Sequence, residues 1–207
     1  MKVYLDFDDV LCETFAELER FARAEFGKDP EPGRSVHFDL HESLGLSDAE
    51  YRLFMDRFHA ERLLGIPEIP GACAALRAWI AAGHEPVVVT GRPVSAAADS
   101  ARWLAERGLA GVPVLHVDKF ARFPDPDAPG VVPFPALASM GFGLAVEDAP
   151  AALDVLARSR LCPYAVFERP WNRDWAPPHG AAAPVLRARS WSDIAPLAQS
   201  AGRAGGA

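Results

Sequence analysis

The sequence contains little lysine: 3 of its 21 basic residues are Lys, and the other 18 are Arg. It also has no basic run, and its formal net charge is −7 at pH 7. Because nucleic acids are bound through a positive patch that neutralises their phosphates, a nucleic acid polymer is an unlikely partner. A small phosphorylated molecule is not excluded, since one well-placed lysine and a metal ion can hold it.

Cysteine is also scarce. Cys12, Cys73 and Cys162 are scattered and form no Cys-x-x-Cys pair. A disulfide framework or a zinc cage is therefore not expected, and a reducing compartment fits best. No apolar run approaches the ~18 residues of a membrane-spanning helix, and the N-terminus leads into a strand without a signal-peptide pattern. We expect a cytoplasmic protein that does not contact a membrane.

Short apolar runs alternate with helical patterns along the 207 residues. This alternation predicts an α/β fold, a Rossmann-like parallel sheet with helices on both faces. No glycine-rich P-loop or dinucleotide fingerprint is present. The predicted strands are 3–5, 87–89, 112–117, 143–146, 164–167 and 185–188. The predicted helices between and after them are 70–82, 95–107, 151–158 and one that starts at Ser192 or Asp193.

Residues 12–66 interrupt the alternation after the first strand. Ser47 and Glu50 form a capping-box pattern, and apolar residues at helical spacing, including aromatic ones, follow Glu50. We therefore predict a core domain of residues 1–11 and 67–200, a small helical cap of residues 12–66, and a disordered tail at 201–207. The aromatic stripe of the cap is typical of a core, although part of it could face a cleft.

Polar groups follow four of the predicted strands. In a parallel sheet, ligands bind outside the carboxyl ends of the strands, so these groups should meet around one cleft. They are Asp6 and Asp8, Thr90 and Gly91, Lys119, and Glu147 with Asp148. Each group alone has a simpler explanation: a solvated turn, a surface lysine, or the N-cap of the next helix. Their combination at successive strand ends favours a functional site.

The chemistry of these groups suits phosphoryl transfer. Asp6, Asp8 and Asp148 supply the oxygen ligands that Mg²⁺ prefers. A cation next to a carboxylate keeps it ionised, so Asp6 could attack phosphorus and form an aspartyl-phosphate. Asp8 could protonate the leaving oxygen and later accept a proton from water.

Phosphate binding is predicted for a second set of residues. Thr90 offers a hydroxyl, Gly91 allows its backbone N–H to approach closely, and Lys119 provides a positive charge. Two other readings are disfavoured. Cys12 lies near the acidic turn, but small apolar packing explains it better than a nucleophilic role. The cluster His37-Asp39-His41-Glu42 lacks the helical spacing of a transition-metal site.

The four motifs together resemble those of the haloacid dehalogenase-like hydrolase superfamily. They are Asp6-Phe7-Asp8-Asp9-Val10, Thr90-Gly91-Arg92, Lys119 and Glu147-Asp148. The resemblance implies that Asp6 is the nucleophile and a metal ligand, and that Asp8 is the general acid/base and binds the metal through its backbone carbonyl. It also implies that Asp148 ligates the metal and that Glu147 acts mainly through water. The presence of Asp8 argues against the dehalogenase branch.

Softer cues resemble the 5′-nucleotidase type C group, the 5′(3′)-deoxyribonucleotidases. They are Phe38-Asp39-Leu40, Val89-Thr90-Gly91-Arg92-Pro93 and Pro170-Trp171-Asn172-Arg173. This resemblance implies a nucleoside monophosphate whose base stacks on cap aromatics; Phe15, Phe38 and Arg92 are candidates for the pocket. Two alternatives stay open: a phosphatase for another small metabolite such as a sugar phosphate, and a non-catalytic protein that binds a phosphorylated ligand. The oligomeric state is also open.

Overall fold

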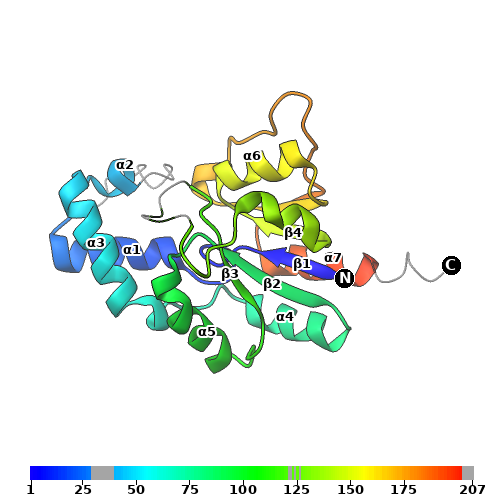
Figure 1. Ribbon diagram of the computed structural model, residues 1–207, viewed down its shortest axis with the longest axis horizontal. Coiled ribbons are helices and arrows are strands. Elements are labelled where there is room, and N and C mark those ends of the chain that lie inside the picture. Colours follow the sequence, from blue (N-terminus) through cyan, green and yellow to red (C-terminus); the bar gives the residue numbers. More distant parts are fainter. Residues whose placement is uncertain (29–39, 121–122, 124, 126, 202–207) are drawn as a thin grey trace.

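The computed structural model describes residues 1–28, 40–120, 123, 125 and 127–201 (Figure 1). Six parallel strands form one sheet in the order β3-β2-β1-β4-β5-β6. Their bounds are β1 Lys2–Leu5, β2 Glu85–Thr90, β3 Val114–His116, β4 Phe142–Glu147, β5 Tyr164–Phe167 and β6 Leu186–Ala188. The predicted α/β parallel sheet is confirmed, with all six strands in the expected stretches.

The central strand β1 is covered on both faces, which explains its continuous apolar run. Val3 and Leu5 belong to one hydrophobic core and Tyr4 to the other, because successive side chains of a strand alternate between faces. All three side chains are completely buried. The strand therefore ends in the middle of the molecule, and the residue after it, Asp6, starts from a rigid position.

Helices cover both faces of the sheet (Figure 1). On one face, α4 (Ala72–Ala81), α5 (Ala97–Glu106) and α7 (Trp191–Ala201) contribute buried tryptophans to the core. On the other face lie α6 (Pro150–Ser159) and the 3₁₀ helix η4 (Phe134–Met140). The indole N–H groups of Trp79, Trp103 and Trp191 each donate to a backbone carbonyl, so their burial leaves no donor unpaired.

Several predicted boundaries differ from the structure. Strand β3 is shorter than the predicted 112–117, and a 3₁₀ turn, η3 (Val94–Ala96), precedes α5. The helix η4 was not predicted, because the proline-rich sequence before it shows no period. Helix α7 extends to Ala201, the first residue of the predicted disordered tail, and residues 202–207 lie outside the described part of the chain.

The segment between β1 and β2 is helical. It contains α1 (Thr14–Phe26), α2 (Leu40–Leu44), α3 (Asp48–Glu61) and the 3₁₀ turn η2 (Leu63–Gly65). Figure 1 shows α1, α2 and α3 together beyond the end of β1. The capping box of Ser47 and Glu50 is present, with both reciprocal hydrogen bonds. The division into cap and core remains a prediction.

The aromatic stripe of this segment mostly faces inward. Phe54 and Phe58 of α3 pack on Phe21 of α1, with ring centroids 5.4 and 5.8 Å from that of Phe21. All three are almost completely buried. In the described parts of the chain, no helix has the length and apolar character needed to cross a membrane.

Candidate active site

Lys119 joins two acidic residues from neighbouring strands. Its Nζ donates to Oδ1 of Asp6 at 2.8 Å and to Oε2 of Glu147 at 2.7 Å. The lysine side chain is 0% exposed. Although burial opposes it, the two carboxylates raise the pKa of Lys119, so the side chain is an ammonium ion. The residues after β1, β3 and at the end of β4 thus meet at the carboxyl edge of the sheet.

Asp6, Glu147 and Asp148 form a compact carboxylate cluster. One oxygen of each lies within 4.8 Å of the other two, and all three residues are buried. Burial, followed by repulsion from Glu147, raises the pKa of both Asp6 and Asp148 well above the ordinary range. When ionised, the three carboxylates and the Lys119 ammonium leave two negative charges, which a divalent cation would neutralise.

The individual oxygens show which residues could hold such a cation. Oε1 of Glu147 accepts the backbone N–H groups of Asp148 and Ala149, and Oε2 accepts from Lys119 and from the Tyr4 hydroxyl. Glu147 is therefore fully engaged. In contrast, Oδ1 of Asp148 is buried and has no hydrogen-bond partner among the described residues. A hard cation such as Mg²⁺ fits Asp6 and Asp148, with Glu147 behind them. Neither Glu147 nor Asp148 is the N-cap of α6, which is Ala149.

The Asp8 carboxylate is not part of this cluster and has its own hydrogen-bond partners. Nη2 of Arg92 donates to its Oδ1 at 2.6 Å, and Nε donates to both carboxylate oxygens at 3.0 and 3.1 Å. The Thr14 hydroxyl adds a bond to Oδ1 at 2.6 Å. Although burial opposes it, the Arg92 guanidinium lowers the pKa of Asp8, so the carboxyl group is ionised. Arg92 lines the cavity described below. Besides its bonds to Asp8, its Nη1 donates to the Ser100 hydroxyl and its Nη2 to Sγ of Cys12.

Thr90 and Gly91 lie at the end of β2. The Thr90 hydroxyl donates to Oδ2 of Asp8 at 3.4 Å and accepts the backbone N–H of Arg92. A Cβ atom on Gly91 would lie 2.7 Å from the ring of Phe120, so no larger residue fits without displacing that ring. Whether Thr90, Gly91 and Lys119 bind phosphate remains a prediction.

The turn after Asp8 connects the end of β1 to helix α1. Asp9 has φ of 58°, the left-handed region that Asp tolerates better than most residues. Its carboxylate accepts the backbone N–H of Phe15, in the first turn of α1, which has no side-chain cap from Glu13. Burial raises the pKa of Asp9 to about 8. Cys12, in the same turn, is fully buried and burial raises its pKa, which argues against a nucleophilic thiol.

The loop after β5 reaches the same site. The 3₁₀ turn η5 (Pro170–Asn172) places the Trp171 indole N–H 2.9 Å from Oδ2 of Asp148. Nδ2 of Asn172 donates to the backbone carbonyl of Asp148 at 2.8 Å. In the sequence, only a resemblance indicates a role for residues Pro170 to Arg173; the structure places Trp171 and Asn172 against Asp148.

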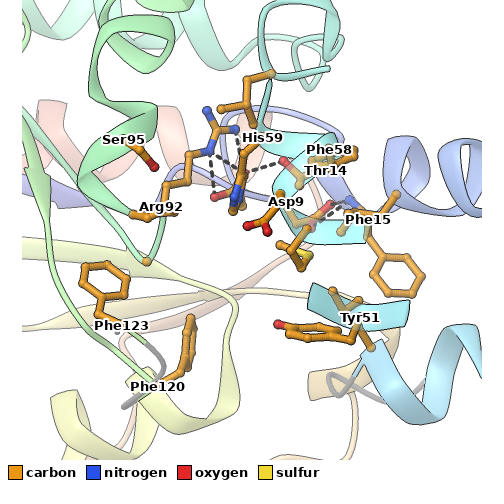
Figure 2. Close-up of a pocket in the computed structure, with 18 of the residues that line it drawn as sticks. Asp9, Thr14, Phe15, Tyr51, Phe58, His59, Arg92, Ser95, Phe120 and Phe123 are labelled. Carbon is orange, nitrogen blue, oxygen red and sulfur yellow. Dashed lines mark hydrogen bonds and ion pairs between the residues drawn. The ribbon is translucent and has the colours of Figure 1, made fainter. Parts of the chain in front are cut away.

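A cavity of about 850 Å³ opens above these groups. Asp6, Asp8 and Asp148 line it together with residues of α1 and α3. Figure 2 shows Phe15, Tyr51, Phe120 and Phe123 around it. The rest of its aromatic lining is Phe58, His41, His59 and Trp171.

Among the predicted pocket residues, Phe15 and Arg92 line the cavity, whereas Phe38 lies outside the described residues. Of the cluster His37-Asp39-His41-Glu42, the first two also lie outside them, and His41 stacks on Tyr51 with ring centroids 4.4 Å apart. Sequence reasoning missed the aromatic residues of the core, Phe120, Phe123 and Trp171. Phe120 could have been noticed because it directly follows Lys119, and Trp171 because its loop follows a strand end.

Sequence comparison gives no match: no protein-family model and no curated protein is detectably similar to this chain. Comparison with solved structures, in contrast, finds similar proteins. One similar structure is a haloacid dehalogenase family hydrolase from Deinococcus radiodurans R1, crystallised with phosphate and sodium. It is 17% identical to this chain, with a TM-score of 0.60, and the match covers 97% of this chain and 96% of that one.

Two further structures agree with this result. A hydrolase from Pseudomonas syringae is 16% identical with a TM-score of 0.56 and full coverage of both chains, 100% each. CbbY from Rhodobacter sphaeroides, in complex with phosphate, is 17% identical with a TM-score of 0.58, covering 93% of this chain and 95% of that one. The chain therefore has the α/β fold of the haloacid dehalogenase-like hydrolases.

Proposed function

We propose that this protein is an Mg²⁺-dependent phosphomonoesterase that acts through an aspartyl-phosphate on Asp6. The observation that carries the proposal is the convergence of Asp6, Asp148 and Lys119 from three strand ends within one buried cluster that borders a cavity. The two structural neighbours that were crystallised with phosphate support a phosphorylated ligand.

Asp6 is the proposed nucleophile, because its two carboxylate oxygens differ in their hydrogen bonds. Oδ1 accepts from Lys119 and from the backbone N–H of Phe7, at 2.8 and 2.7 Å. Oδ2 is then the oxygen that attacks phosphorus, while the bond from phosphorus to the leaving oxygen breaks. The cation, when bound by Asp6 and Asp148, supplies positive charge that keeps Asp6 ionised and attracts the phosphate.

Asp8 is the proposed general acid and base. It gives a proton to the leaving oxygen and then accepts one from the water that hydrolyses the aspartyl-phosphate. In the structure Arg92 keeps it ionised, which suits the second step. A bound phosphate monoester would bring negative charge close to Asp8 and raise its pKa, which the first step needs.

The proposed substrate is a (deoxy)nucleoside 5′-monophosphate, and the protein would then resemble the 5′-nucleotidase type C group. The cavity of about 850 Å³ can hold a nucleoside. Its aromatic walls offer faces for a base, because stacking on an aromatic ring is worth about 1–3 kcal/mol and works for every base. Phe15 is the proposed stacking residue on the cap side.

The experiment that tests this proposal is a panel of phosphorylated metabolites with and without Mg²⁺. The panel should contain nucleoside and deoxynucleoside monophosphates, sugar phosphates and p-nitrophenyl phosphate, with phosphate release as the readout. We expect release from nucleoside monophosphates to exceed that from sugar phosphates, and chelation of the metal to stop both. A preference for sugar phosphates would show that the substrate is a sugar phosphate and not a nucleotide. Thermal stabilisation by these ligands without hydrolysis of any of them would contradict the proposal that the protein is an enzyme.

A further inference from the structure

The two carboxylate oxygens of Asp148 differ in their contacts. Oδ2 accepts the indole N–H of Trp171 at 2.9 Å, whereas the structure describes no hydrogen-bond partner for the buried Oδ1. A buried polar atom without a partner is costly and rare. The neighbouring groups are the carboxylates of Asp6 and Glu147, and a cation bound between Asp6 and Asp148 would give Oδ1 a partner.

The Trp171 indole is held in place by the loop that carries it. Nδ2 of Asn172 donates to the carbonyls of Asp148 and Phe167, each at 2.8 Å, and its Oδ1 accepts the N–H of Arg169 at 3.1 Å. Nη2 of Arg187 donates to the Asn172 carbonyl at 2.6 Å. These bonds tie the turn to Asp148, which follows β4, and to strands β5 and β6, so the direction of the indole N–H is set before any ligand binds.

The ring of the same tryptophan forms part of the cavity wall. Its centroid lies 5.0 Å from that of Phe15, with the ring planes tilted by 50°, and both residues line the cavity. Trp171 therefore contacts an acidic residue of the cluster through its edge and the cavity through its ring.

We infer that Trp171 is a positioning residue for the cation: by holding Oδ2 of Asp148, it directs Oδ1 of that carboxylate to the metal ion. This inference rests on the cation site of the proposed function. Hydrogen bonds from behind a ligating carboxylate fix its orientation, and their loss typically weakens metal binding by about 10–100-fold.

The chain provides a matched control on the same loop. The indole N–H of Trp175 donates to Oδ1 of Asp154 at 2.9 Å, and neither residue lines the cavity. Trp171→Phe and Trp175→Phe therefore remove the same kind of hydrogen bond, once at the proposed site and once away from it. A third variant, Trp171→Gln, keeps an N–H donor at a similar distance from the backbone but removes the ring.

The test is titration of the full chain with MgCl₂, and separately with MnCl₂, followed by calorimetry. We expect Trp171→Phe to bind either ion about 10-fold more weakly, and Trp175→Phe to bind like the unchanged protein. Trp171→Gln should keep most of the cation affinity and raise KM, because the cavity wall is lost. For Trp171→Phe, saturating Mg²⁺ should restore kcat, which a purely structural defect would not allow.

Equal cation affinity of Trp171→Phe and the unchanged protein would overturn the inference, and so would the absence of cation binding by the unchanged protein. Should Trp171→Phe fail to fold, Trp171→Gln decides: a loss of cation affinity in folded Trp171→Gln counts against the role of the N–H, and retained affinity supports it. Cation binding without hydrolysis of any phosphate ester would refute the proposed function and leave this inference standing.

Discussion

Asp6→Asn is expected to abolish phosphate ester hydrolysis and leave the fold intact. An amide oxygen cannot form a stable phosphoenzyme, and removal of a nucleophile that works within a catalytic group can reduce kcat by about 10⁶-fold. The measurement is steady-state phosphate release with the best substrate of the panel, at saturating Mg²⁺.

The same substitution should not damage the structure, because Asn keeps the shape of Asp and an oxygen that can accept from Lys119 and Phe7. It also removes a charge from a crowded cluster, in which the pKa of Asp6 is raised by burial and by Glu147. We therefore expect the melting temperature in the presence of a chelator to stay equal or rise. Asp154→Asn, on helix α6, is the matched control and should keep full activity. Normal turnover by Asp6→Asn would show that another group attacks phosphorus.

Lys119→Met is expected to destabilise the protein strongly and to abolish activity. The ammonium group is completely buried and pairs with two carboxylates. Its removal leaves Asp6 and Glu147 facing each other without a counterion, and breaking a buried pair in this way typically costs about 3–5 kcal/mol. Urea denaturation in the presence of a chelator measures the free energy of unfolding.

Lys28→Met is the control, because Lys28 is a partly exposed lysine that pairs with Glu50 at 3.2 Å. Surface ion pairs contribute about 0–1 kcal/mol, so this variant should unfold almost like the unchanged protein. Adding Glu147→Gln to Lys119→Met should recover part of the stability, since it removes one of the two carboxylate charges left without a counterion. It should not recover the activity. Similar stability of Lys119→Met and Lys28→Met would mean that the buried ion pairs do not hold the strand ends together.

The sequence predicts the fold well, because buried parallel strands produce short apolar runs whose ends are polar. Asp6, Lys119 and Asp148 could be placed at one edge of the sheet from this rule alone, although 113 residues separate Asp6 from Lys119. The ends of strands are less certain, as the short β3 shows, because apolar residues next to a strand can be buried without pairing.

The partners of the candidate site residues could not be predicted in the same way. The sequence indicates that Arg92 follows Thr90 and Gly91, but not that its guanidinium turns toward Asp8, 84 residues away. That direction depends on the buried environment, in which the guanidinium also lies over the ring of Phe7 with its carbon 4.0 Å from the ring centroid. Nor does helical period decide which aromatic residues face the cavity: Phe15 lines it, whereas Phe21 on the same helix packs on Phe54 of α3.

The position of Trp171 has an optical consequence. All five tryptophans lie in the described part of the chain, and only Trp171 lines the cavity. Trp79, Trp103 and Trp191 are at most 1% exposed and sit in an apolar core that no substrate reaches. A molecule that stacks in the cavity would therefore quench or shift the emission of one indole against a constant background from the others, so that the unlabelled protein can report on its own occupancy by intrinsic fluorescence.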